Sequence, residues 1–114
     1  MGLVLSWDSL ELRAICENEL EAKQKLGMQV ASILQTRLAE LVAATTISDL
    51  LVGNPTPFPD STGEVVYKIN LGRDHELFFG NAHPNPPMIE DLLDWTRIRR
   101  IKILSIHEKN GTNE

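Results

Sequence analysis

The sequence has only one cysteine among its 114 residues, few aromatic side chains and no long apolar run. A lone Cys16 excludes an internal disulfide, so we expect a cytoplasmic protein in which Cys16 is a small buried side chain rather than a nucleophile. The apolar runs are too short to cross a bilayer, and the apolar stretch at residues 2–7 lacks the basic segment of a signal peptide.

Basic residues are also fewer than acidic residues. The sequence has 11 Lys and Arg and 16 Asp and Glu, which gives a net charge of −5. Proteins that hold nucleic acid through its phosphates usually carry a basic surplus, so binding to RNA or DNA would need a local basic patch. The histidines His75, His83 and His107 do not have the spacing of zinc ligands. We therefore expect no metal and no cofactor.

What is present fits an ordinary globular chain. Apolar residues make up 42% of the sequence and charged residues 24%. A chain of this length builds one core of modest size. We expect residues 1–114 to form a single domain.

The first half predicts a strand and two helices. Residues 2–7 alternate between two faces, which predicts a short strand. Asp8, with Glu11 three residues later, predicts a helix start with a capping box. Apolar residues then recur at helical spacing as far as Gly27 and again over residues 28–44. This predicts a helical hairpin, broken at Gly27, that covers one face of a sheet.

The second half predicts antiparallel strands. Prolines make residues 53–60 and 81–94 loops, and strict alternation over residues 64–71 predicts a strand. A turn at residues 72–74 returns the chain through residues 75–79 as a hairpin. Helices gathered on one face of a mainly antiparallel sheet make a two-layer α+β domain.

The last apolar run is the densest. Isoleucine and leucine occupy five of the ten positions of residues 98–107. This density predicts a strand that is buried on both faces and therefore central in the sheet. The run ends on polar side chains that can do chemistry, namely His107, Glu108 and Lys109, so we expect any active site near this end.

The order of these segments resembles a known family. The residues that carry the resemblance are YKINLG at 67–72, LFF at 77–79, AH at 82–83, DWTRI at 94–98 and RIKIL at 100–104. With the short strand and helical hairpin before them, they resemble the HigB-like branch of the RelE/ParE toxin superfamily, whose members include killer and killer-suppression proteins of plasmid maintenance. The resemblance extends over nearly the whole chain and implies a RelE-like fold.

The resemblance implies a toxin-family component of a type II toxin–antitoxin system. Such proteins cleave mRNA, commonly on the ribosome and without a metal, and a cognate helix-turn-helix antitoxin silences them. The RNA's own 2′-hydroxyl attacks the adjacent phosphate, which requires a base, cations and an acid.

Carried onto this sequence, the family's site is only partly retained. Lys68 keeps the cation of the first strand of the hairpin, whereas Glu76 replaces an arginine. The terminal Asp-Tyr-His of the family falls on Glu108, Lys109 and Asn110. Glu108 can substitute for the acid and Lys109 can replace the tyrosine only as a cation, while Asn110 cannot transfer a proton.

The candidate site therefore combines several groups. We expect Lys68 and Arg73 to bind phosphate and His107 or Glu108 to transfer a proton. Lys109 would act on the leaving-group side. His107 would share the site only if a bulge changed which face it occupies; otherwise it is a surface histidine. An RNA-facing patch and a set of solvated charges are equally good interpretations of four further basic residues: Arg97, Arg99, Arg100 and Lys102.

Two hypotheses of different classes follow. The first is an mRNA endonuclease, weakened by the departures from the family. The second is an interaction module of the same fold that has lost cleavage and binds an antitoxin-like protein. Glu76, Asn110 and the acidic composition favour the second. A gyrase-directed relative, as in the ParE branch, is a third option.

Overall fold

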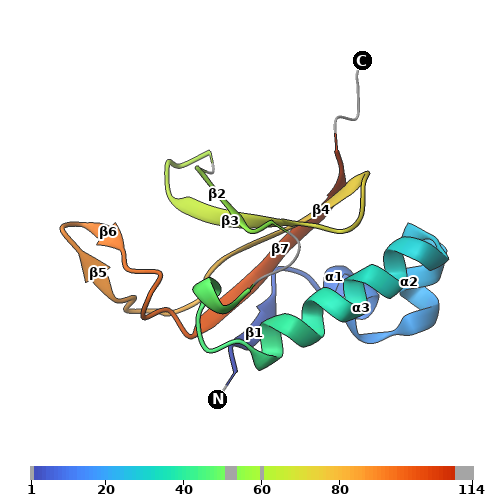
Figure 1. Ribbon diagram of the computed structural model, residues 1–114, viewed down its shortest axis with the longest axis horizontal. Helices are drawn as coiled ribbons and strands as arrows, with labels where there is room; N and C mark the ends of the chain where they lie inside the picture. Colours follow the sequence, from blue (N-terminus) through green and yellow to red (C-terminus); the bar gives the residue numbers. More distant parts are fainter. Residues whose placement is uncertain (1, 51–53, 60, 110–114) are drawn as a thin grey trace.

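The computed structural model describes residues 2–50, 54–59 and 61–109, and its centre is a mixed five-stranded sheet (Figure 1). The strand order is β1-β7-β4-β3-β2, in which β7 pairs in parallel with β1 and all other neighbours are antiparallel. The strands are β1 (Val4–Trp7), β2 (Thr56–Pro59), β3 (Val65–Asn70), β4 (His75–Asn81) and β7 (Arg100–Glu108).

The last strand is central in the sheet, as predicted, because β7 lies between β1 and β4. The prediction that this strand is buried on both faces was wrong. Ile101 and Ile103 are buried, whereas Lys102 and Leu104 are only partly buried. Helices therefore cover one face of the sheet, and we call the opposite side the outer face.

Three helices form the second layer: α1 (Leu10–Glu17), α2 (Glu19–Leu26) and α3 (Met28–Ala43). The residue that caps the start of α1 is Ser9 rather than Asp8, because the Ser9 hydroxyl accepts a hydrogen bond from the Leu12 amide at 3.1 Å. Asn18 ends α1 and caps α2 by accepting two backbone amides, so the first predicted helix is two. The predicted break at Gly27 is confirmed, with a φ of 87° that favours glycine.

The core lies between these helices and the sheet. Leu34 and Leu41 of α3 are fully buried against Leu77 and Phe79 of β4 and against Ile103 of β7. Figure 1 shows α3 running below β4 and β7 in that view, with α1 beside β1. None of the helices in the described part of the chain is both long and apolar enough to span a bilayer.

One predicted loop contains a strand. Thr56–Pro59 forms β2 at the edge of the sheet, antiparallel to β3. Prolines are tolerated on an edge strand because its outer amides need no partner in the sheet. Residues 53 and 60 of the predicted loop lie outside the described residues.

The second predicted loop contains a small hairpin, β5 (Met88–Ile89) and β6 (Leu92–Leu93), visible on the left of Figure 1. Trp95 joins this segment to the sheet, because its ring lies 4.8 Å from that of Tyr67 and 6.3 Å from that of Phe79. The segment that carries β5 and β6 is therefore packed against the domain by aromatic contacts.

Candidate functional site

A β-bulge in β7 decides which side chains share the outer face. Phe79 pairs with Ile103 and the preceding Phe78 pairs with Ser105, which leaves Leu104 as an extra residue. Such a bulge interrupts the alternation of a strand. The residues beyond Leu104 therefore occupy the opposite faces from those that regular alternation predicts.

The bulge brings His107 onto the outer face. Leu77 is fully buried beneath the helices and pairs with Ile106, so the next pair, Glu76 and His107, points the other way. Lys68 shares this face, because it lies opposite Phe78 in the β3–β4 pair. A bulge was the condition under which we expected His107 to join Lys68, and β7 contains one.

Lys68 and Glu76 form the ionic centre of this face. The Lys68 Nζ lies 3.3 Å from the Glu76 Oε2, and the two side chains are 30% and 16% exposed. The charge reversal at Glu76 therefore does not leave an isolated carboxylate, because the neighbouring strand supplies its cation. His107 lies on the other side of Glu76, one strand further along the sheet.

Two phenylalanines complete the group. The Phe78 ring meets the Phe58 ring edge-on at 5.7 Å and the His107 ring at 5.5 Å. The Lys68 ammonium lies 5.3 Å from the centre of the Phe58 ring. We call these five residues the outer-face cluster. They come from four adjacent strands, β2, β3, β4 and β7.

The other predicted catalytic residues lie elsewhere. Glu108 pairs with His75 and so faces away from His107, which contradicts a site containing both. Lys109 follows the strand and its amide donates to the Asp74 carbonyl at 2.6 Å. Arg73 is exposed on the β3–β4 turn, where it lines a cavity of about 500 Å³ against α3. Asn110 lies outside the described residues.

The four residues predicted to bind RNA divide into two pairs. The Arg97 Nε donates to Asp94 at 2.6 Å, and Arg99 donates to the Thr96 carbonyl, so both serve the loop before β7. Arg100 and Lys102 lie on the outer face at the start of β7, level with Val4 and Ser6 of β1.

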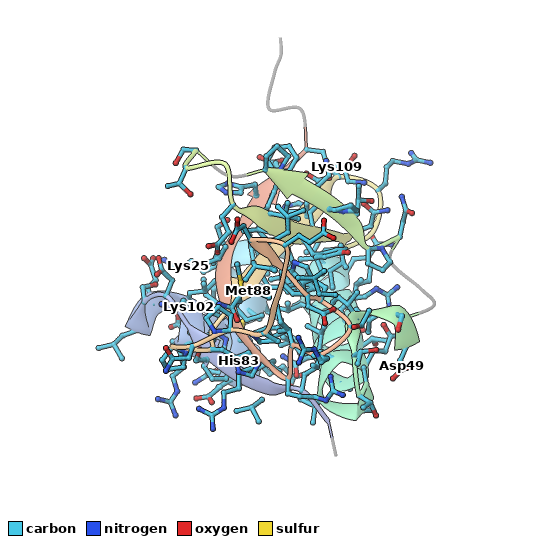
Figure 2. The ribbon with its side chains drawn as sticks, turned by 90° about the vertical axis from the view of Figure 1, so that its left-hand side faces the viewer. Lys25, Asp49, His83, Met88, Lys102 and Lys109 are labelled. Carbon is cyan, nitrogen blue, oxygen red and sulfur yellow. The ribbon has the colours of Figure 1, made fainter. Side chains whose placement is uncertain are left out.

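Arg100 and His107 are seven residues apart in β7, which spans roughly 23 Å. In Figure 2, Lys102 and His83 lie toward the lower end and Lys109 lies near the upper end. Of the predicted residues on β7, Arg100, Lys102 and His107 therefore form one row along the outer face rather than a single patch.

The cations of the two layers differ in whether they are paired. Each of the four cations on the helices has an acidic partner on the helices, in the pairs Arg13–Glu17, Lys23–Glu19, Lys25–Glu11 and Arg37–Glu40. Within the described residues, Arg100, Lys102 and Lys109 have no such ion pair. The cations of the helical layer are thus paired, whereas Arg100 and Lys102 of β7 and Lys109 after it are not paired within the described residues.

The role of His83 was not predicted. Its Nε2 accepts the Arg99 amide at 2.9 Å and the Arg100 amide at 3.2 Å, so it anchors the loop after β4 to the start of β7. Burial, followed by the nearby charges of Arg100 and Arg99, lowers the pKa of His83. His83 therefore belongs to the structure of the loop and not to the outer-face cluster.

Cys16 is a small buried side chain, as predicted, and Tyr67 packs against the core. Cys16 is buried at 4% exposure, and this burial raises the pKa of its thiol. Tyr67 stacks on Phe79 at 6.1 Å beneath the helices, which makes it a core residue rather than a base-stacking one. Among the described residues, no group of three potential metal ligands comes together.

Sequence reasoning missed Phe58 and Phe78 as members of the site and treated Glu76 only as a departure. Phe58 stood in a proline-rich segment, where no strand was expected, so its partner could not be inferred. Glu76 and Phe78 are separated by one residue and flank the buried Leu77, which was a usable signal that both occupy the outer face.

Comparisons of this chain with protein-family models, with curated proteins and with solved structures each gave no match.

Proposed function

We propose that this chain is a RelE/HigB-like toxin-family protein that cleaves mRNA at the outer-face cluster. The observation that carries the proposal is the bulge at Leu104, because it sets His107 on the same face as Lys68. A proton-transfer group and a cation thereby share one face of an acidic protein, with β4 between their strands. These are the groups that attack by a 2′-hydroxyl on a neighbouring phosphate requires.

The element order supports the same proposal. An N-terminal strand, a helical layer and a three-stranded antiparallel β3-β4-β7 unit follow the order that the resemblance implies. The parallel pairing of β1 with β7 makes β7 central, so its side chains are available to a substrate that crosses the sheet. Arg100 and Lys102 extend this row and offer contacts for the phosphates of an RNA strand.

The partners follow from the proposed activity. A cytoplasmic protein that cleaves mRNA must be silenced in the cell that makes it, and we propose a cognate helix-turn-helix antitoxin for this role. The substrate is mRNA, free or on the ribosome. The chemistry needs no metal, because the lysine and the histidine supply the charge and the proton.

A second candidate function is a binding module that has lost cleavage. The Lys68–Glu76 ion pair favours it, because a carboxylate 3.3 Å from the ammonium competes with phosphate for that cation. In this case the row of cations on β7 would hold an acidic protein partner instead of RNA.

Induced expression in a bacterium tests the proposal. We expect the wild-type chain to stop growth and to shorten cellular mRNA, and we expect Lys68→Ala and His107→Ala to relieve both effects. Lys25→Ala, which removes an exposed cation on α2, is the matched control and should remain toxic. Normal growth with soluble wild-type protein would favour the binding module.

A further inference from the structure

The two edge strands of the sheet, β1 and β2, differ in how well they are protected against pairing with a further strand. β2 contains Pro57 and Pro59, which have no amide hydrogen to offer to another chain. β1 has the sequence Val-Leu-Ser-Trp, with no proline and no charge. The edge at β2 is therefore blocked, whereas the edge at β1 is open to a partner strand.

The backbone groups of β1 alternate between the sheet and its open side. The amides of Val4 and Asp8 donate to carbonyls in and just before β7, at 2.8 Å and 3.0 Å. Alternate residues of a strand direct their backbone groups to opposite sides, so the amides and carbonyls of Leu5 and Trp7 point away from β7. These are the groups that another strand would bind.

An apolar groove of about 460 Å³ lies along the same edge. Leu5 and Trp7 line it on the helical side of the sheet, because they lie opposite the buried Ile101 and Ile103. Apolar side chains of α3, among them the exposed Val42, form its other wall. A strand paired with β1 would direct alternate side chains toward this groove. The edge thus offers both hydrogen bonds and an apolar surface to a partner.

We propose that this partner is a second copy of the chain, and that the two β1 strands pair antiparallel about a two-fold axis at Ser6. Leu5 then lies opposite Trp7 of the second copy, and both side chains face the helical side. Such a pair exchanges two backbone hydrogen bonds, so the two equivalent pairs use all the outward groups of Leu5 and Trp7. One continuous sheet runs through both copies.

Charge complementarity selects a second copy in this register. Asp8 and Arg100 are both exposed and have no ion pair within the described residues. Arg100 lies beside Val4 on the outer face. In the two-fold pairing, Asp8 of the second copy lies on the other side of Val4, two strand spacings or roughly 10 Å from Arg100. An arginine side chain reaches this far with its stem over Val4, so the dimer contains two equivalent contacts between Asp8 and Arg100.

The same two residues do not meet within one chain. Arg100 is level with Val4, and Asp8 is four residues further along the strand, which corresponds to roughly 13 Å. The contact between them therefore reports on the second copy alone. Because β1 is only four residues long, the interface is small, and we expect a reversible dimer that is a monomer in dilute solution.

Charge exchange between Asp8 and Arg100 tests the register. Sedimentation velocity would measure self-association of the wild type, Asp8→Lys, Arg100→Glu and an equimolar mixture of the two variants, from micromolar to millimolar concentration. The wild type should pass reversibly from monomer to dimer. Each variant alone creates two like-charge contacts and should associate roughly tenfold more weakly. Arg73→Glu changes the net charge as much as Arg100→Glu but lies on the β3–β4 turn, so it should associate as the wild type does.

The mixture is the decisive sample. A dimer of one Asp8→Lys copy and one Arg100→Glu copy contains two opposite-charge contacts, so its association should return to about the wild-type strength. This recovery would also show that both variants are folded. An interface that does not relate Asp8 to Arg100 by a two-fold axis would give a mixture that associates as weakly as its components.

Amide hydrogen exchange, followed by NMR, tests the backbone pairing. The amides of Leu5 and Trp7 should exchange more slowly as the protein concentration rises. The amides of Val4 and Asp8 already donate within the chain and serve as the internal control, so their exchange should change far less.

Three results would overturn the proposal. A wild-type chain that stays monomeric at millimolar concentration would leave the edge to a strand of another protein. A mixture that associates no better than its components would exclude the two-fold register. Exchange of Leu5 and Trp7 that is independent of concentration would exclude β1 from the interface. None of these measurements involves RNA, so the proposed function stands or fails separately.

Discussion

His83 Nε2 accepts a hydrogen bond from the Arg99 backbone amide at 2.9 Å. This bond joins the loop after β4 to the loop before β7, on either side of the segment that carries β5 and β6. The same nitrogen also accepts the Arg100 amide at 3.2 Å. Both bonds need the neutral form of the ring, because a protonated Nε2 is a donor. The position of the basic row on β7 therefore depends on the protonation state of His83.

The first prediction concerns pH. The pKa of His83 is lowered in the folded chain, so its contribution to stability is complete above the unfolded value of about 6.5 and declines as the pH falls below it. His83→Ala should reduce the free energy of unfolding by about 1 kcal/mol at pH 7.5, which is typical for a lost hydrogen bond. Urea unfolding at pH 7.5 and pH 5 should show this difference shrinking at the lower pH, and a constant difference would contradict the role of His83.

The second prediction concerns Asp94, which is buried at 7% exposure before the start of β7. Hydrogen bonds from Thr96 and then from Arg97 lower the pKa of Asp94, so its contribution to stability is present above about pH 3.9 and is lost as the pH falls further. Asp94→Asn should lower the Tm by a few degrees at pH 7 and by much less at pH 3. An Asp94→Asn protein as stable as the wild type at pH 7 would argue against this network.

The third prediction concerns the bulge. If Leu104 is the extra residue of β7, then deleting it should leave Phe78 opposite Ser105 and Glu76 opposite His107. The contact between the Phe78 and His107 rings should survive, and a nuclear Overhauser effect between the two rings would detect it. In a strand without a bulge, the same deletion would turn His107 to the other face and abolish the signal.

The fourth prediction concerns the unpaired cations. Arg100→Ala and Lys102→Ala should each weaken binding of a fluorescent single-stranded RNA by roughly threefold to tenfold at low salt. Each substitution should also reduce the slope of log affinity against log salt by about 0.7, the value for one phosphate contact on a single strand. Lys25→Ala should leave both quantities unchanged, because Lys25 pairs with Glu11 in the helical layer. Unchanged slopes for both β7 variants would exclude this row from RNA binding.

Local signals made much of the fold predictable. The glycine at position 27 separates two helices, and the strict alternation of residues 64–71 precedes the β3–β4 hairpin. The boundary between α1 and α2 at Asn18 was harder to recognise. One residue both ends α1 and caps α2, so the helical spacing of the apolar residues is almost uninterrupted. The strand β2 was missed because its prolines are unfavourable everywhere in a sheet except at its edge.

The candidate site was less predictable, because its residues meet only through pairing of distant strands. The bulge did leave a trace, since the residues facing the helices are Ile101, Ile103 and Ile106 and the last interval is three instead of two. The density of apolar residues in this segment was interpreted as burial on both faces, which concealed that change. Lys68 and His107 were expected in the site, but their link through Glu76 and Phe78 required the register of β4.

The most direct test of this account is the chemistry of the cleaved RNA. The wild-type chain would be incubated with translating ribosomes and a defined mRNA, and the ends of the fragments would be analysed. We predict fragments that end in a 2′,3′-cyclic phosphate and fragments that begin with a 5′-hydroxyl, no cut where the attacking 2′-hydroxyl is replaced by hydrogen, and little cleavage by His107→Ala. Intact mRNA, or cleavage that persists with the 2′-deoxy nucleotide or without His107, would contradict the claim that the outer face of this sheet cleaves RNA.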